Sequence, residues 1–161
     1  MSNEKVIKDV QEKIQKAYEK LTKPAYTKKF AEFVKEDVKK RVRLGHGVKA
    51  NLSPKQRLKP IKDSTIKQRQ KLSQVGELSQ FTSPRRSNLT RSGQLTDSII
   101  GLGMNREFIV EVQDSRNDGV TNSEIVSGQE KQGRPFLYIT DLEQKRLNNL
   151  VKKAILEEIR K

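Results

Sequence analysis

The hydrophobic positions in the first part of the chain recur at helical spacing and predict two amphipathic helices. Over residues 3–22 they fall at steps of three and four residues, which places one apolar stripe on a helix: Val6, Val10, Ile14, Ala17 and Leu21. Pro24 interrupts that helix. A second apolar face follows from Tyr26 to Leu44, with Gly45 as its stop: Tyr26, Phe30, Phe33, Val34, Val38 and Val42. We expect a helical hairpin or one bent helix.

The middle of the chain is less regular. Ser53 followed by Pro54 is typical of a helix start, because proline suits the first helical position. Asp63-Ser-Thr can begin a further helix that reaches about Leu72. Residues 73–91 are rich in Ser, Gln and Arg and show no period, so we expect a flexible basic loop there.

The last part of the chain contains the best strand pattern. Phe108, Val110 and Val112 alternate with Ile109, Glu111 and Gln113, as expected of a strand with one buried face. We expect one helical turn before Gly101-Leu-Gly103, where the glycines then force an extended or turning backbone. Residues 104–106 would form the turn of a β-hairpin that pairs residues 98–104 with 107–113. We expect the two glycines to mark a bend in the first strand.

Three further elements are predicted near the C-terminus. Asn122 can cap and begin a short helix, and Pro135 directs residues 136–139 into a short strand. Thr140 and Glu143 then form a capping box for a final helix with an apolar stripe to the end. Together the patterns predict one α+β domain over residues 1–161, in which long N-terminal helices and a C-terminal helix pack on a small antiparallel β-sheet. Its parts are a basic helical segment (1–62), a helix with a basic loop (63–91), and the hairpin, short strand and last helix (92–161).

Composition limits the core and excludes several kinds of chemistry. Only 32% of the 161 residues are hydrophobic while 34% are charged, so the core is small and partner subunits are expected to bury part of the surface. A highly soluble monomer is the alternative. The chain has no cysteine, which excludes disulfides, thiolate catalysis and cysteine zinc sites. We also expect no membrane span and no signal peptide.

Charge is concentrated in the first part of the chain. Residues 1–62 carry 18 Lys and Arg against 7 Asp and Glu, whereas residues 93–161 carry 10 against 11. This asymmetry predicts a polyanion or an acidic protein surface near the first part. Candidate contact residues for phosphate or an acidic partner lie in two clusters beside turns: Lys39, Lys40, Arg41, Arg43, Arg85, Arg86 and Arg91. A solvated helix face is the competing interpretation of the first cluster.

No catalytic, metal or cofactor site is predicted. His46 stands alone between two glycines and lacks the partners that a zinc site or a general base requires. Gly101-Leu-Gly103 lacks the third glycine of a dinucleotide fingerprint, and no phosphate-binding loop of the nucleotide-hydrolase kind is present. A hydrolase that uses His46 remains the least favoured of three hypotheses.

Two short motifs carry a family resemblance. Thr90-Arg-Ser-Gly-Gln-Leu-Thr-Asp-Ser-Ile99 and Glu130-Lys-Gln-Gly-Arg-Pro-Phe-Leu137 resemble, in the same order, the T-G-x-L-x-x-S-I and E-x-G…R-P-F-L stretches of the tail-completion and virion-morphogenesis proteins of tailed phages. The likeness runs from Leu89 to the C-terminus. The segment Asn122-Ser-Glu-Ile-Val-Ser-Gly128 departs from the family pattern, and the helical region before residue 62 is longer and more basic than the family's.

The resemblance implies structural roles for the motif residues. It makes Ser92-Gly93 a tight turn and Leu95 and Ile99 the packing anchors of the hairpin. Glu130 and Gly133 would lead into a strand formed by the last motif residues: Arg134, Pro135, Phe136 and Leu137.

The resemblance also implies a function. A protein of this family is not an enzyme, binds no cofactor, and assembles in the host cytoplasm as a homo-oligomeric, hexameric ring of the virion. Its partners would be the tail tube protein and the head connector or stopper proteins, with possible contact to packaged DNA. The alternative function, from the charge alone, is a sequence-independent nucleic-acid-binding protein.

Overall fold

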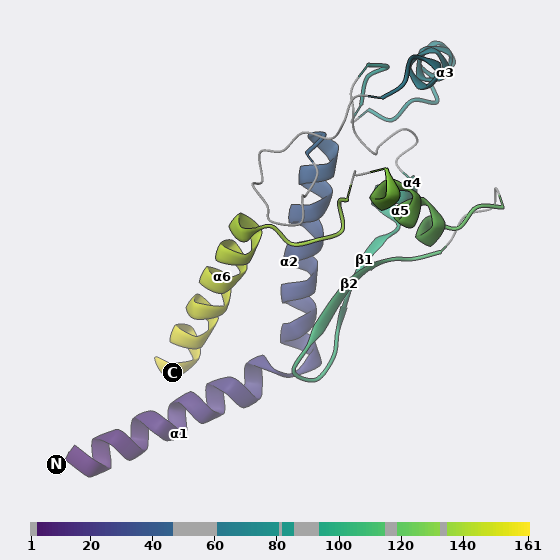
Figure 1. Ribbon diagram of the computed structural model, residues 1–161. Coiled ribbons are helices and arrows are strands. Elements are labelled where there is room, and N and C mark those ends of the chain that lie inside the picture. The colour runs from purple at the N-terminus through teal and green to yellow at the C-terminus, as the bar shows by residue number, and fades with distance from the viewer. Residues whose placement is uncertain (1–2, 47–60, 81, 86–93, 115–118, 133–134) are drawn as a thin grey trace.

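The structure, a computed structural model, describes residues 3–46, 61–80, 82–85, 94–114, 119–132 and 135–161. Figure 1 shows the elements in chain order: α1 (Asn3–Leu21), α2 (Pro24–Arg43), α3 (Asp63–Gln74), α4 (Gln94–Asp97), β1 (Ile99–Gly103), β2 (Phe108–Val112), α5 (Asn122–Lys131) and α6 (Asp141–Ile159). The predicted α+β class is confirmed. Among the described residues, none of the helices is both long enough and apolar enough to span a bilayer.

Helix α2 is the centre of the packing. Proline suits its first turn, where a backbone N–H has no acceptor within the helix, so Pro24 begins α2 as well as ending α1. The β1–β2 hairpin lies against one side of α2 and α6 lies on another (Figure 1). The predicted apolar face of α2 supplies much of the core cluster: Phe30, Val34, Val38 and Val42, with Leu21, Leu95, Ile99, Phe136 and Leu147 from other elements.

The predicted hairpin is confirmed in position and register. β1 and β2 pair antiparallel from Ile99 opposite Val112 to Gly103 opposite Phe108, without a break. The two glycines do not interrupt the pairing of the first strand. Instead, Gly101 and Gly103 face α2 so closely that an added Cβ on Gly103 would lie 2.2 Å from the backbone nitrogen of Lys28. Glycine is needed here for close packing of strand on helix.

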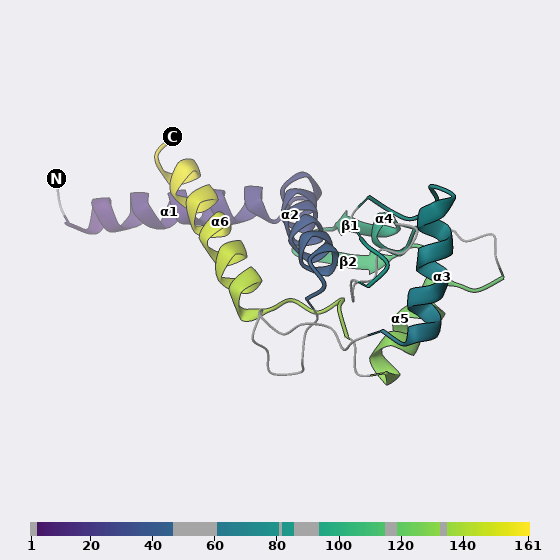
Figure 2. The same cartoon turned by 90° about the horizontal axis from the view of Figure 1, so that it is seen from above.

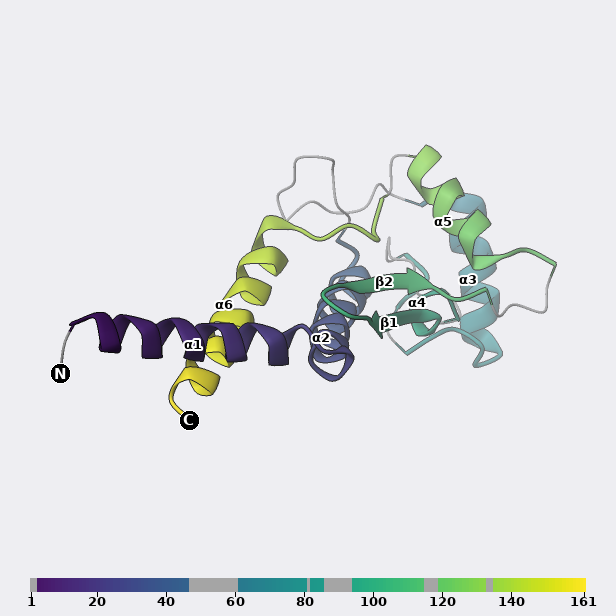
Figure 3. The same cartoon turned by 90° about the horizontal axis from the view of Figure 1, so that it is seen from below.

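Helix α1 does not fold back along α2 as a helical hairpin would. The chain turns at Thr22–Lys23, and α1 extends away from the foot of α2 (Figures 2 and 3). Its C-terminal half crosses the end of α6, where the Lys20 ammonium lies 2.6 Å from the Glu158 carboxylate. The N-terminal half continues past α6 and away from the body of the molecule.

Two predictions in the last third need correction. Residues 136–139 form no strand, because the backbone there is held by a side chain and not by a neighbouring strand. Glu130, which was expected to lead into this strand, lies inside helix α5. Helix α5 is capped by Thr121, one residue before the expected cap, in a capping box with Glu124. The capping box of α6, Thr140 with Glu143, is confirmed.

Some predictions concern residues that the structure does not describe. The helix start at Ser53-Pro54 and the turn at Ser92-Gly93 lie outside the described residues, as do Arg86, Arg91, Gly133 and Arg134. Helix α3 begins at Asp63 as predicted and ends two residues beyond Leu72. The described residues between α3 and residue 85 contain turns and no regular element, as the sequence predicts.

Candidate assembly surfaces and the buried joint that positions them

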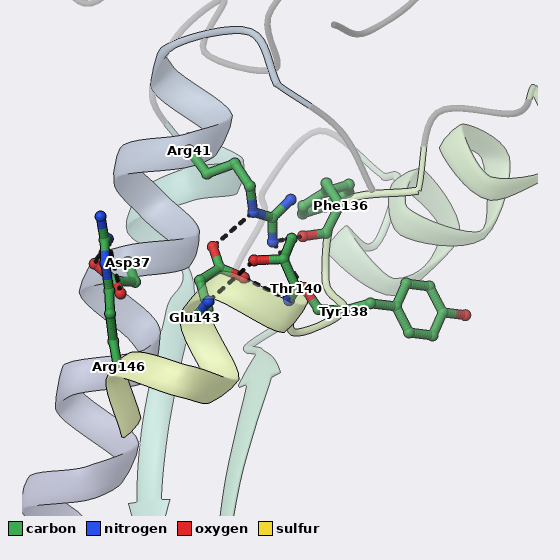
Figure 4. Close-up of polar contacts among 7 residues, drawn as sticks. All are labelled: Asp37, Arg41, Phe136, Tyr138, Thr140, Glu143 and Arg146. Carbon is green, nitrogen blue, oxygen red and sulfur yellow. Dashed lines mark hydrogen bonds and ion pairs between the residues drawn. The ribbon is translucent and has the colours of Figure 1, made fainter. Parts of the chain in front are cut away.

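The most specific polar arrangement is a buried joint between the end of α2 and the start of α6. Arg41 donates from Nε to Glu143 Oε1 at 2.7 Å, and from Nη2 to the backbone carbonyls of Phe136 at 2.9 Å and Tyr138 at 2.7 Å (Figure 4). Both charged side chains are 6% exposed. One guanidinium thus ties α2 to α6 and to the segment that precedes α6.

Glu143 serves this joint and the α6 cap together. The Thr140 backbone N–H donates to Glu143 Oε2 at 2.8 Å, and the Glu143 N–H donates to Thr140 Oγ1 at 3.2 Å. Each carboxylate oxygen therefore has its own donor, which offsets the desolvation of the buried charge. Arg41 Nη1 is also buried and has no hydrogen-bond partner among the described residues.

This joint corrects the prediction for Arg41. The sequence placed Arg41 among the residues that contact a polyanion, but its guanidinium is buried and ion-paired. The signal for burial was its spacing. Arg41 follows Val34 by seven residues and Val38 by three, and it therefore lies on the apolar face of α2.

The other predicted basic residues are distributed as follows. Lys40 and Arg85 are exposed, while Lys39 and Arg43 are half-buried. An Arg43 nitrogen lies 3.8 Å from Asp97 Oδ1, which offsets part of its charge. The structure thus keeps Lys39, Lys40 and Arg43 together on the last turns of α2.

The motif residues that the structure describes are mainly structural. Leu95 and Ile99 are buried in the core cluster, in keeping with their expected role as anchors of the hairpin. Phe136 is fully buried there too, although it belongs to no strand, and Leu137 packs partly buried against the cluster. The two motifs therefore hold the hairpin and the start of α6 on α2.

The first candidate assembly surface is the apolar stripe of α1. Its C-terminal members, Ala17 and Leu21, are 2% and 6% exposed where α1 meets the rest of the protein. Its other predicted members are about half exposed, as are Ile7 and Tyr18, which lie on the same side of the helix: Val6 50%, Ile7 56%, Val10 45%, Ile14 49% and Tyr18 52%. The sequence predicted the stripe, but only the structure shows that most of it has no cover among the described residues.

An ion cluster fixes this helix at the point where the stripe becomes buried. Glu158 accepts from Lys20 Nζ at 2.6 Å, from Lys161 Nζ at 2.9 Å and from the Tyr26 hydroxyl at 3.3 Å. The hydrogen bonds from Lys20 and then Lys161 lower the pKa of Glu158 from 4.5 to about 2. The Lys20–Glu158 contact raises the pKa of Lys20 above 10.5. The cluster orients α1 relative to α6.

The second candidate surface is the outer face of the hairpin. Side chains alternate along each strand, so Ile100, Leu102, Ile109 and Glu111 point away from α2. Leu102 and Ile109 are direct cross-strand partners and are 42% and 41% exposed. Figure 3 views this face from below, and no described element lies in front of it.

His46 forms no site in the described part of the chain. Its backbone N–H donates to the carbonyl of Arg41 at 3.1 Å, and its side chain is half-buried. Among the described residues, no three His, Asp or Glu side chains are grouped so that they could hold a metal ion.

Comparison of the chain with models of known protein families, with curated proteins and with solved structures finds no match to any of them. The resemblance of the two motifs to phage tail-completion proteins therefore stays a prediction from the residues themselves.

Proposed function

We propose that this chain is a structural protein of a tailed-phage virion, a tail-completion or tail-terminator protein that forms a ring and joins the tail tube to the head connector. The observation that carries the proposal is the projecting α1, whose apolar stripe is about half exposed from Val6 to Ile14. Contiguous exposed apolar surface is typical of protein-protein contacts. The order of the two motifs supports the choice of family.

The mechanism of such a protein is shape and contact, without catalysis. A closed ring requires two different surfaces on each protomer, because one surface of each copy contacts the other surface of the next copy around the ring. The chain offers two such surfaces, on α1 and on the outer face of the hairpin, and they lie on different sides of α2. The buried Arg41–Glu143 joint keeps α6 in place, and the Lys20–Glu158 contact keeps α1 on α6.

The alternative, a sequence-independent nucleic-acid-binding protein, depends on the basic residues. Lys39 and Lys40 on the last turns of α2 favour it, while the burial of Arg41 and the contact of Arg43 with Asp97 weaken it. DNA binding measured over a salt series separates the two functions. Tight binding by isolated monomers that falls steeply with salt would favour the alternative.

Removal of the gene from the phage that encodes it tests the proposal. Electron microscopy of the lysate is expected to show filled heads and tails that are not joined, or tails without a regular end. Expression of the chain from a plasmid should restore joined particles, and an antibody should label the head-tail junction. Joined, infectious particles that lack the protein would contradict the proposal.

A further inference from the structure

We infer that the exposed apolar arc of α1 docks onto the outer face of the β1–β2 hairpin of a second copy of this chain. The arc consists of Val6, Ile7, Val10, Ile14 and Tyr18, and the receiving face of Ile100, Leu102 and Ile109. The inference rests on the homo-oligomeric assembly in the proposed function, and it names the two surfaces that meet.

The arc is wide and uninterrupted by charge. At 3.6 residues per turn, Val6, Ile7, Val10, Ile14, Ala17, Tyr18 and Leu21 occupy an arc of about 120° that contains no charged side chain. A helix buries an arc of this width against one partner. Among the described residues, α6 and α2 meet the arc at its C-terminal end, and no described element covers the rest of it.

The outer face of the hairpin is not covered by any element in the described part of the chain. α2 covers its inner face, and Gly101 and Gly103 allow the two backbones to approach closely. A two-stranded sheet is marginal without packing on its apolar surface, and Leu102 and Ile109 present such surface to solvent. A helix with an apolar arc on the outer face would complete a helix-sheet-helix arrangement.

The charges beside the two surfaces are complementary. Lys13 lies next to one edge of the arc, beside Val6 on the helix surface, and forms no ion pair among the described residues. On the hairpin, Glu107 and Glu111 are exposed, and no described cation pairs with either carboxylate. Docking in one orientation along the strands brings the lysine edge beside these carboxylates, which selects the hairpin as partner and sets the direction of the helix.

Pairing of α1 with α1 of another copy fits less well. An antiparallel pair places the same edge of both helices together, so that the like charges of Lys13 from both copies lie on the same side of the pair. A parallel pair conflicts with α6, which already lies against the arc near Ala17 and Leu21.

Cross-linking between single cysteines tests the inference directly, because the chain has no cysteine of its own. Val10→Cys and Ile109→Cys are prepared separately in the full chain and mixed, and a short bis-maleimide is added. The matched control replaces Val10→Cys by Gln15→Cys, which lies on α1 outside the apolar arc. Circular dichroism checks that all three variants fold. The reaction is run on the free protein and after addition of tail tubes.

The inference predicts a cross-linked dimer from Val10→Cys with Ile109→Cys at a yield at least about tenfold above that from Gln15→Cys with Ile109→Cys. A Val10→Cys dimer formed as readily without Ile109→Cys would overturn it in favour of helix self-pairing. An oligomer of the expected ring mass without the cross-link would overturn the inference while leaving the proposed function intact. A protein that stays monomeric under both conditions would overturn both.

Discussion

Arg41 and Glu143 show how a single pair of residues holds two distant segments together. The guanidinium has three acceptors, one from the carboxylate and two from backbone carbonyls, and these contacts offset the burial of its charge. Neither partner is predictable from its neighbours in sequence, because they are 102 positions apart. The sequence led us to expect Arg41 at a surface contact; its spacing from Val34 and Val38 fits the apolar face instead, and the acceptors explain why a charge is tolerated there.

We expect Arg41→Met to lower the free energy of unfolding by about 3–5 kcal/mol, because the buried Glu143 carboxylate loses its cation and the carbonyls of Phe136 and Tyr138 lose their donor. Arg146→Met is the matched control. Arg146 also joins α6 to α2, through Asp37 at 3.3 Å, but its side chain is 50% exposed (Figure 4). Its loss should cost about 1 kcal/mol or less. Urea denaturation measures both, and similar losses in the two variants would refute the role given to Arg41.

We expect Gly103→Ala to lower the free energy of unfolding by about 1–3 kcal/mol, because the new methyl group meets the backbone of Lys28. Gly128→Ala serves as control. Gly128 lies within α5 and has nothing within 4 Å of an added Cβ, so alanine should stabilise by up to about 1 kcal/mol through helix propensity. Thermal unfolding compares them. A Gly103→Ala protein as stable as the parent would show that the strand does not pack on α2 this closely.

At the scale of elements, the sequence predicted those helices and strands whose formation depends on residues close together in the chain. The helical stripes of α1 and α2, the capping box of α6 and the alternation in β2 are set by residues a few positions apart, and all four elements are present. Residues 136–139 were predicted wrongly as a strand because extended backbone has the same signature whether its carbonyls meet another strand or, as here, an arginine. The exposure of the α1 stripe could not be predicted from the sequence either, because the spacing of apolar residues indicates which side of a helix is apolar but not which element covers that side.

The contact between α1 and α6 should depend on pH through Glu158. Its folded-state pKa, about 2, lies below the ordinary value of 4.5, so the ionised carboxylate stabilises the fold above about pH 4.5. That stabilisation is lost as the pH falls from 4.5 towards 2. Melting temperatures of the parent and of Glu158→Gln should therefore differ most at neutral pH and converge near pH 2.

Glu157→Gln is the control for this prediction, because Glu157 is exposed and forms no ion pair among the described residues. Its melting temperature should stay close to that of the parent throughout. A difference between Glu158→Gln and the parent that is the same at pH 7 and at pH 2 would contradict the role of the carboxylate.

The whole molecule consists of a well-packed centre and a projecting helix. α2, the hairpin and α6 share one core, while most of the apolar arc of α1 has no cover among the described residues. Such an arrangement suits a protomer whose folding is completed by its neighbours. In the proposed ring, the α1 arc and the outer face of the hairpin contact each other between neighbouring copies. The central claim is therefore that this chain works as an assembly of its own copies.

The mass of the native assembly, measured on the parent protein and on Val10→Glu, tests this claim most directly. The parent should form one closed oligomer, a hexamer by the family resemblance, alone or on tail tubes. Val10→Glu should fold normally, since Val10 is 45% exposed in the protomer, but weaken assembly by about a hundredfold because it places a charge in the contact. Gln15→Glu, which adds the same charge outside the arc, should assemble like the parent. A parent protein that remains at the monomer mass of 18.5 kDa, with or without tail tubes, would contradict the account.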